Sequence, residues 1–132
     1  MPFSEKRVFG NLGEDLACKH LSSKGYVVSE RNYLKKAGEI DIVALKDGTI
    51  HFVEVKTMHS PAPGLSNNVD QFRPEDNVHP KKLDRLARTV ELYLQERGVS
   101  SQTPWQIDLL AVLIDTKEKK ARVRFLENVN AW

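Results

Sequence analysis

The stretch that decides the fold is residues 38–57, GEIDIVALKDGTIHFVEVKT. It contains two apolar, β-branched runs, and the dipeptide Asp47-Gly48 stands between them. Asp-Gly between two such runs is a strong signal for a two-residue hairpin turn. We therefore expect an antiparallel hairpin, with one strand over residues 38–45 and the next over residues 49–57.

This hairpin places charged side chains in otherwise apolar strands. With a two-residue turn, Asp41 lies opposite Glu54 and Glu39 lies opposite Lys56. Facing residues of an antiparallel pair have Cβ atoms roughly 4.5–5.5 Å apart, so the two carboxylates of the first pair would repel each other. Either one of them takes a proton through a raised pKa, or a cation lies between them.

The residue types favour the cation. Two carboxylates with a main-chain carbonyl and waters form the oxygen-rich site that Mg²⁺ or Mn²⁺ accepts. Lys56 would then orient a water or stabilise the charge that develops on a phosphate. Solvated ion pairs on an exposed sheet face give the same spacing, however, so the pattern by itself leaves both interpretations open.

A helix over about residues 4–24 supplies a further candidate ligand, Glu14. Apolar residues recur at helical spacing, and Gly25 stands where a helix would end. Glu14 shares its face with Ala17, Cys18 and Leu21, a partly apolar face that looks inward. Asp15 instead has Lys19 four residues on, which is typical of a surface ion pair.

The rest of the chain completes an α/β pattern. The segments are a strand over 26–33, a long loop over about 59–79, a helix over 80–97, a strand over 105–115 and a strand over 121–126. With the first helix and the hairpin, the order is α-β-β-β-α-β-β. It predicts a mixed β-sheet flanked by helices in one domain, residues 1–132.

Composition restricts the class of protein. The 132 residues are 40% hydrophobic and carry a net charge of only +2, so a nucleic-acid partner has to be inferred from where the charges lie. No apolar run is long enough to span a bilayer, and the single Cys18 fits a reducing compartment, so we expect a cytoplasmic protein with no membrane partner. His20, His51, His59 and His79 have no metal-ligand spacing and are interpreted as structural or surface residues.

The motifs together are more specific than any one of them. GEDLACKHLSSKGYVV, RNY, GEIDIVAL, FVEVKT and HPKKLDRLARTVELYL resemble the YraN-like family of small, uncharacterised bacterial proteins. That family looks related to Holliday-junction resolvases in the restriction-endonuclease-like, PD-(D/E)xK superfamily. The resemblance implies a restriction-endonuclease-like fold, Mg²⁺-dependent hydrolysis of phosphodiesters in DNA, branched DNA included, and a homodimer with two active sites.

The same resemblance assigns roles to residues. It implies that Asp41, Glu54 and Glu14 hold the metal, that Lys56 assists the attacking water, and that Lys82 contacts phosphate. Leu34 and Met58 stand where the family often has arginine, which would weaken substrate contact rather than metal binding.

Basic residues near these positions could bind a polyanion. Lys81, Arg85 and Arg88 form one stripe of the second helix, and Arg31 lies ahead of the acidic pair. Lys117–Arg124 is a further basic segment. The leading hypothesis is a metal-dependent nuclease. A nucleic-acid-binding protein without turnover and a protein-interaction module that uses the long loop are the alternatives.

Overall fold

The computed structural model describes residues 5–59 and 80–129, which form two helices and five strands. The elements are α1 (Glu5–Ser23), β1 (Val27–Lys35), β2 (Gly38–Lys46), β3 (Thr49–His59), α3 (Pro80–Glu96), β4 (Trp105–Asp115) and β5 (Lys120–Leu126). The predicted α/β class, the mixed sheet and the order of elements are confirmed.

The strands form one sheet in the order β1-β2-β3-β4-β5. β3 and β4 are parallel, and the other three neighbouring pairs are antiparallel. β3 and β4 can be parallel because α3 lies between them in the chain, and a parallel pair needs such a crossover connection.

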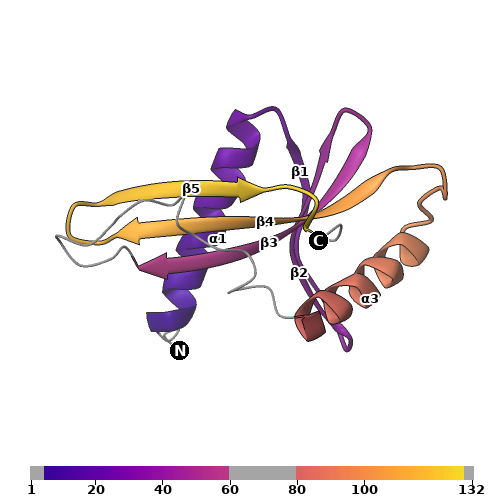
Figure 1. The fold of residues 1–132 in the computed structure, drawn as a ribbon, viewed down its shortest axis with the longest axis horizontal. Coiled ribbons are helices and arrows are strands. Elements are labelled where there is room, and N and C mark those ends of the chain that lie inside the picture. Colours follow the sequence, from indigo (N-terminus) through magenta and orange to yellow (C-terminus); the bar gives the residue numbers. More distant parts are fainter. Residues whose placement is uncertain (1–4, 60–79, 130–132) are drawn as a thin grey trace.

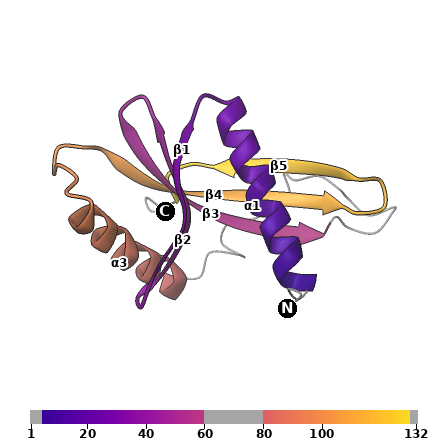
Figure 2. The ribbon, with the colours of Figure 1, turned by 180° about the vertical axis from the view of Figure 1, so that it is seen from behind.

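The helices cover different parts of the sheet. Figure 1 shows α1 crossing behind β3, β4 and β5, with α3 at one end of the sheet beside β2, and Figure 2 shows the same arrangement from behind. Ala17 and Leu21 of α1 pack against Ile42, Val53 and Leu110. On the other face, Leu86, Val90 and Tyr93 of α3 pack against Phe52, with Tyr33, Ile40 and Val43 in the same cluster.

Local signals fix the element ends. Asp47 and Gly48 have φ of 49° and 79°, the two positive values of a type I′ turn, and Lys46 pairs with Thr49 as predicted. Gly25 and Gly98, with φ of 89° and 62°, follow α1 and α3 as left-handed C-terminal caps.

One glycine sets the distance between α1 and the sheet. A Cβ built on Gly13 would lie 1.8 Å from Thr57 Oγ1, so only a residue without a side chain fits there. This close approach brings the next residue of α1, Glu14, to the edge of the acidic pair predicted on β2 and β3.

The predicted loop and the histidines have different outcomes. His59 is the last residue of β3, and residues 60–79 of the predicted loop, with His79, lie outside the described residues. His51 is buried and has a structural contact: its Nδ1 lies 2.6 Å from Oδ2 of the fully buried Asp108. Neither helix within the described residues is long and apolar enough to cross a membrane.

Candidate active site

The acidic pair lies where β2 leaves β3. The two strands pair from the turn up to Ile42 and Val53, and beyond that point β2 continues beside β1 alone. At the point of separation, the Val55 N–H donates a hydrogen bond of 2.8 Å to Asp41 Oδ2. The Asp41 carboxylate therefore accepts a hydrogen bond from the Val55 main-chain N–H, at a position where the β2–β3 pairing has ended.

This separation corrects one predicted pair. Glu39 was expected opposite Lys56, but it pairs with Leu34 of β1, because β2 has already left β3 at that position. Asn32, opposite this part of β2, has a φ of 54°, in the left-handed region. Asparagine tolerates that region better than most side chains, and the irregular residue accompanies the change of direction.

Asp41 and Glu54 line the same pocket and interact electrostatically. Burial and, next in size, the charge of Glu54 raise the pKa of Asp41 from its ordinary 3.8 to about 8, while the hydrogen bond from Val55 lowers it. Glu14 and Glu39 push the pKa of Asp41 upwards as well. A nearby cation would lower the pKa of this buried carboxylate and stabilise its charged form.

Glu14 joins the site through Asn32. In the orientation that satisfies its amide, the Asn32 NH₂ group donates to Glu14 Oε1 at 2.9 Å and to Glu39 Oε1 at 3.0 Å. Burial raises the pKa of Glu14 despite the opposing Arg31 guanidinium, and Glu39 and Glu54 contribute to the rise. The inward orientation predicted for Glu14 is thus correct, and an amide links it to β2.

Glu54 forms an ion pair with a lysine of α3. Lys82 Nζ, near the start of α3, lies 2.7 Å from Glu54 Oε1. A pocket of about 200 Å³ adjoins this ion pair and is lined by Gly38, Glu39, Asp41, Glu54, Lys82, Arg85 and Leu86. Acidic side chains of the sheet and basic side chains of α3 therefore face the same space.

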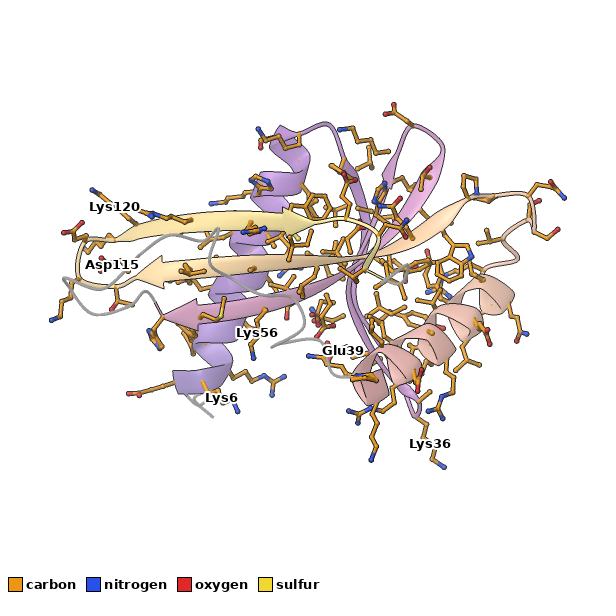
Figure 3. All side chains as sticks on the ribbon, in the orientation of Figure 1. Lys6, Lys36, Glu39, Lys56, Asp115 and Lys120 are labelled. Atoms are coloured by element: carbon orange, nitrogen blue, oxygen red, sulfur yellow. The ribbon has the colours of Figure 1, made fainter. Side chains whose placement is uncertain are left out.

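Lys56 follows Glu54 on the same face of β3, two residues along. Figure 3 shows the side chain between α1 and α3 in this view, on the same side of β3 as Glu39. Lys56 does not line the pocket beside Glu54. It is half-buried and pairs in register with Ala111 of β4.

The Asp15 prediction is corrected, and Arg31 has a structural contact beside the predicted role. Arg31, predicted to bind nucleic acid, lies 2.9 Å from Asp15 and 3.8 Å from Glu14. Asp15 thus has its ion pair with β1 rather than with the predicted Lys19, because the close approach of α1 to the sheet brings β1 within reach. Arg31 therefore holds α1 against β1, next to the candidate ligands.

The residues present can accept a divalent cation, though not as a ready three-ligand cluster. Within residues 5–59 and 80–129, no three His, Cys, Asp or Glu side chains are close enough to hold one ion together. Mg²⁺ commonly binds proteins through one or two carboxylates, with waters or substrate phosphates completing the shell. Asp41 and Glu54, beside a pocket, match that donor set.

Comparisons with known proteins identify the family. Residues 13–112 match the family described as Uncharacterised protein family UPF0102. The chain belongs to this family. A UPF0102 protein of Campylobacter jejuni is 36% identical over 92% of both chains, and one of Sulfurovum sp. is 36% identical over 93% of this chain and 94% of its own. A UPF0102 protein of Clostridium botulinum is 28% identical over 90% of each chain.

Two UPF0102 site residues were not predicted from the sequence of this chain. Asn32 was read only as part of a strand, although an asparagine within an otherwise regular strand is a signal for a left-handed residue. Gly13 carried no prediction either, and glycine in a helix facing a sheet is a signal for close packing. Both residues position Glu14.

Proposed function

We propose that this UPF0102 protein is a metal-dependent nuclease that hydrolyses phosphodiesters in DNA. The observation that supports it most is that Asp41 and Glu54, where β2 and β3 separate, line one pocket together with Lys82. An acidic pair open to a basic helix can hold both a cation and a phosphate, as phosphodiester hydrolysis requires.

In this proposal Asp41 and Glu54, with Glu14 as a further candidate ligand, would hold Mg²⁺ or Mn²⁺. The bound ion would polarise the phosphate and lower the pKa of a water. Val55 keeps the Asp41 carboxylate oriented through its N–H. Asn32 does the same for Glu14. Lys56, next on the face of Glu54, orients the attacking water or stabilises charge on the phosphate.

The start of α3 supplies the phosphate contacts. Lys82 and Arg85 line the pocket, and Lys81 precedes them as an exposed residue of the same helix. A phosphate that enters the pocket offers Lys82 a partner other than Glu54. Release of this lysine would free the Glu54 oxygen for the metal, so substrate and metal would assist each other.

Branched DNA as the substrate, the relationship to Holliday-junction resolvases and a homodimer are finer parts of the proposal. They rest on the sequence motifs GEIDIVAL and FVEVKT, which lie on β2 and β3. A mixed sheet with its carboxylates where two strands diverge is consistent with a restriction-endonuclease-like enzyme.

A cleavage panel tests the activity. Linear, single-stranded, flapped and four-way DNA are incubated with Mn²⁺ and wild type, Asp41→Asn or Lys56→Ala. The proposal expects cleavage of at least one substrate by wild type and its loss in both variants. Equal cleavage by wild type and Asp41→Asn would contradict it, since a contaminating nuclease would act in both.

One observation favours a second function, nucleic-acid binding without turnover. Lys82 Nζ lies 2.7 Å from Glu54 Oε1, so this carboxylate has a cationic partner within the protein itself. A pure binder would retain nucleic acid in Mn²⁺ without cleaving any member of the panel, and Asp41→Asn would bind as wild type does. The enzyme proposal expects metal to strengthen binding in wild type alone.

A further inference from the structure

A second, smaller pocket adjoins the one that holds the acidic pair. It has a volume of about 20 Å³ and shares Glu54, Lys82 and Leu86 with its larger neighbour. The other residues that line it are Leu83, Ile107, Leu109 and Val129. Among the described residues that line this apolar pocket, only the Glu54–Lys82 ion pair is polar, and it lies on the side shared with the larger pocket.

The floor of the apolar pocket belongs to the buried sheet. Leu109 of β4 is in register with Glu54 of β3, so both side chains point to the same face, and Ile107 lies two residues earlier on that face. Ile107 and Leu109 are 1% and 2% exposed. Their side chains offer neither a donor nor an acceptor to a group that enters the pocket.

Two further segments form the walls. Val129 follows β5 and is buried in the cluster beneath α3, and the preceding Asn128 N–H donates a hydrogen bond of 2.9 Å to Oδ1 of Asp108. Leu83 of α3 lies directly after Lys82 and is half-buried, whereas the other apolar residues of the lining are buried. Leu83 is therefore the apolar side chain at the mouth of the pocket.

The size and polarity of the apolar pocket restrict what can enter it. A volume of about 20 Å³ is close to the space that one water-sized group needs, so a nucleobase does not fit. A group that brings an oxygen or nitrogen without a hydrogen-bond partner would also be rejected. In a nucleotide bound through its phosphate at the larger pocket, C2′ of deoxyribose meets both requirements. It is the carbon of that sugar that bears no oxygen, and it lies two bonds from the bridging 3′ oxygen.

We propose that the apolar pocket receives the C2′ methylene of the deoxyribose on the 5′ side of the scissile phosphate, and so selects DNA over RNA. The proposal rests on the nuclease function and adds to it the choice of sugar. A ribose would place its 2′ hydroxyl against Leu83, Ile107 and Leu109, where the hydroxyl loses water without gaining a hydrogen bond. Apolar pockets discriminate against an added hydroxyl by up to about a hundredfold.

Cleavage of labelled DNA in Mn²⁺ tests this proposal. The single-stranded, linear and four-way substrates carry deoxyribose, ribose or 2′-fluoro-deoxyribose at each nucleotide that precedes a cleaved bond. Fluorine favours the same sugar pucker as a hydroxyl group but donates no hydrogen bond, so it separates the cost of burying the hydroxyl from the effect of sugar shape. Asp41→Asn measures background cleavage, including metal-promoted attack by the ribose hydroxyl.

We expect wild type to cleave after ribose roughly 10–100-fold more slowly than after deoxyribose, and 2′-fluoro to slow cleavage much less. Leu83→Ser places a hydroxyl at the mouth of the pocket and should reduce the difference between the two sugars several-fold. Leu94→Ser is the matched control, because Leu94 is also a half-buried leucine of α3 on the same cluster but does not line the pocket. The ratio of the two rates is taken within one protein, so it does not depend on how much of a variant is folded.

Equal cleavage after ribose and deoxyribose by wild type would overturn the sugar selection and leave the nuclease proposal standing. Equal slowing by ribose and 2′-fluoro would overturn it too, because sugar pucker would then explain the preference, and so would a wild-type ratio in Leu83→Ser. No cleavage of any DNA by wild type, or equal cleavage by Asp41→Asn, would overturn both proposals.

Discussion

Lys82 Nζ lies 2.7 Å from Glu54 Oε1, and this contact joins the helix expected to bind substrate to the strand expected to bind metal. The Lys82 side chain is 44% exposed and that of Glu54 18%, so the lysine can leave more readily than the carboxylate. The Lys82 ammonium group neutralises part of the acidic charge of the site.

Replacing Lys82 by methionine is expected to strengthen Mn²⁺ binding in the absence of DNA. The metal would no longer compete with the ammonium group, and a partly exposed ion pair is worth about 0.5–1 kcal/mol, or roughly a two- to fivefold change in affinity. DNA binding by the same variant should weaken. Calorimetric titration measures the first effect, and Lys81→Met, one residue earlier on α3, is the control. Weaker Mn²⁺ binding by Lys82→Met would show that the lysine supports the metal site.

Asp41→Asn is expected to stabilise the metal-free protein at alkaline pH. Burial and the Glu54 charge raise the pKa of Asp41 to about 8, above its ordinary 3.8. The folded state therefore binds this proton more tightly than the unfolded state, and the stability that it contributes is lost as pH rises from about 4 towards 8. Asparagine keeps an oxygen for the Val55 N–H without the charge.

Thermal unfolding in EDTA at pH 6 and pH 8.5 measures this effect. Wild type should lose more stability than Asp41→Asn between the two pH values, and added Mn²⁺ should narrow the difference at pH 8.5. Parallel pH profiles for the two proteins would mean that folding does not raise the pKa of the Asp41 carboxyl group.

Much of this fold follows from local sequence signals. Asp47-Gly48 fixes the hairpin, and Gly25 and Gly98 end the helices where expected, because each needs only its neighbours in the chain. The hairpin register also predicts that Asp41 and Glu54 face each other, although the β2–β3 pairing ends one step earlier, at Ile42 and Val53.

The rest depends on contacts between distant segments. The end of the β2–β3 pairing could not be predicted from the hairpin signals, because it lies far from the turn, where β2 continues beside β1 alone. Asp15 pairs with Arg31 of β1 because α1 packs against the sheet. The i, i+4 spacing that predicted Lys19 as its partner takes account of contacts within one helix only. The Lys82 contact likewise needs α3 in place.

Gly13→Ala is expected to destabilise the protein by about 1–3 kcal/mol or more, as overpacking does. The new Cβ would lie 1.8 Å from Thr57 Oγ1, so α1 would have to move away from β3 and carry Glu14 with it. Gly10→Ala is a matched control in the same helix, with nothing within 4 Å of its Cβ. It should stabilise by about 1 kcal/mol through helix propensity. Denaturant unfolding measures the stability of both variants. Similar free energies of unfolding would argue against close packing of α1 on β3 at Gly13.

Asp108→Ala is expected to cost about 3 kcal/mol, because the buried His51 and two partly buried donors would lose the carboxylate that they contact. The Asp108 carboxylate accepts hydrogen bonds from Gln106 Nε2 and the Asn128 N–H, and its Oδ2 faces His51. Asp115→Ala, at the end of the same strand, removes only turn contacts and should cost about 1 kcal/mol or less. Equal losses of unfolding free energy in the two variants would remove the structural role assigned to this buried network.

The most direct test of the central claim is a calorimetric Mn²⁺ titration of wild type, Asp41→Asn and Glu54→Gln, with the exposed Glu118→Gln as control. If Asp41 and Glu54 share one cation, wild type and the control bind Mn²⁺ alike. Each site variant then loses more than about tenfold in affinity, since even outer-shell changes cost roughly ten- to hundredfold. Wild-type affinity in both site variants, or no Mn²⁺ binding by wild type, would contradict the account.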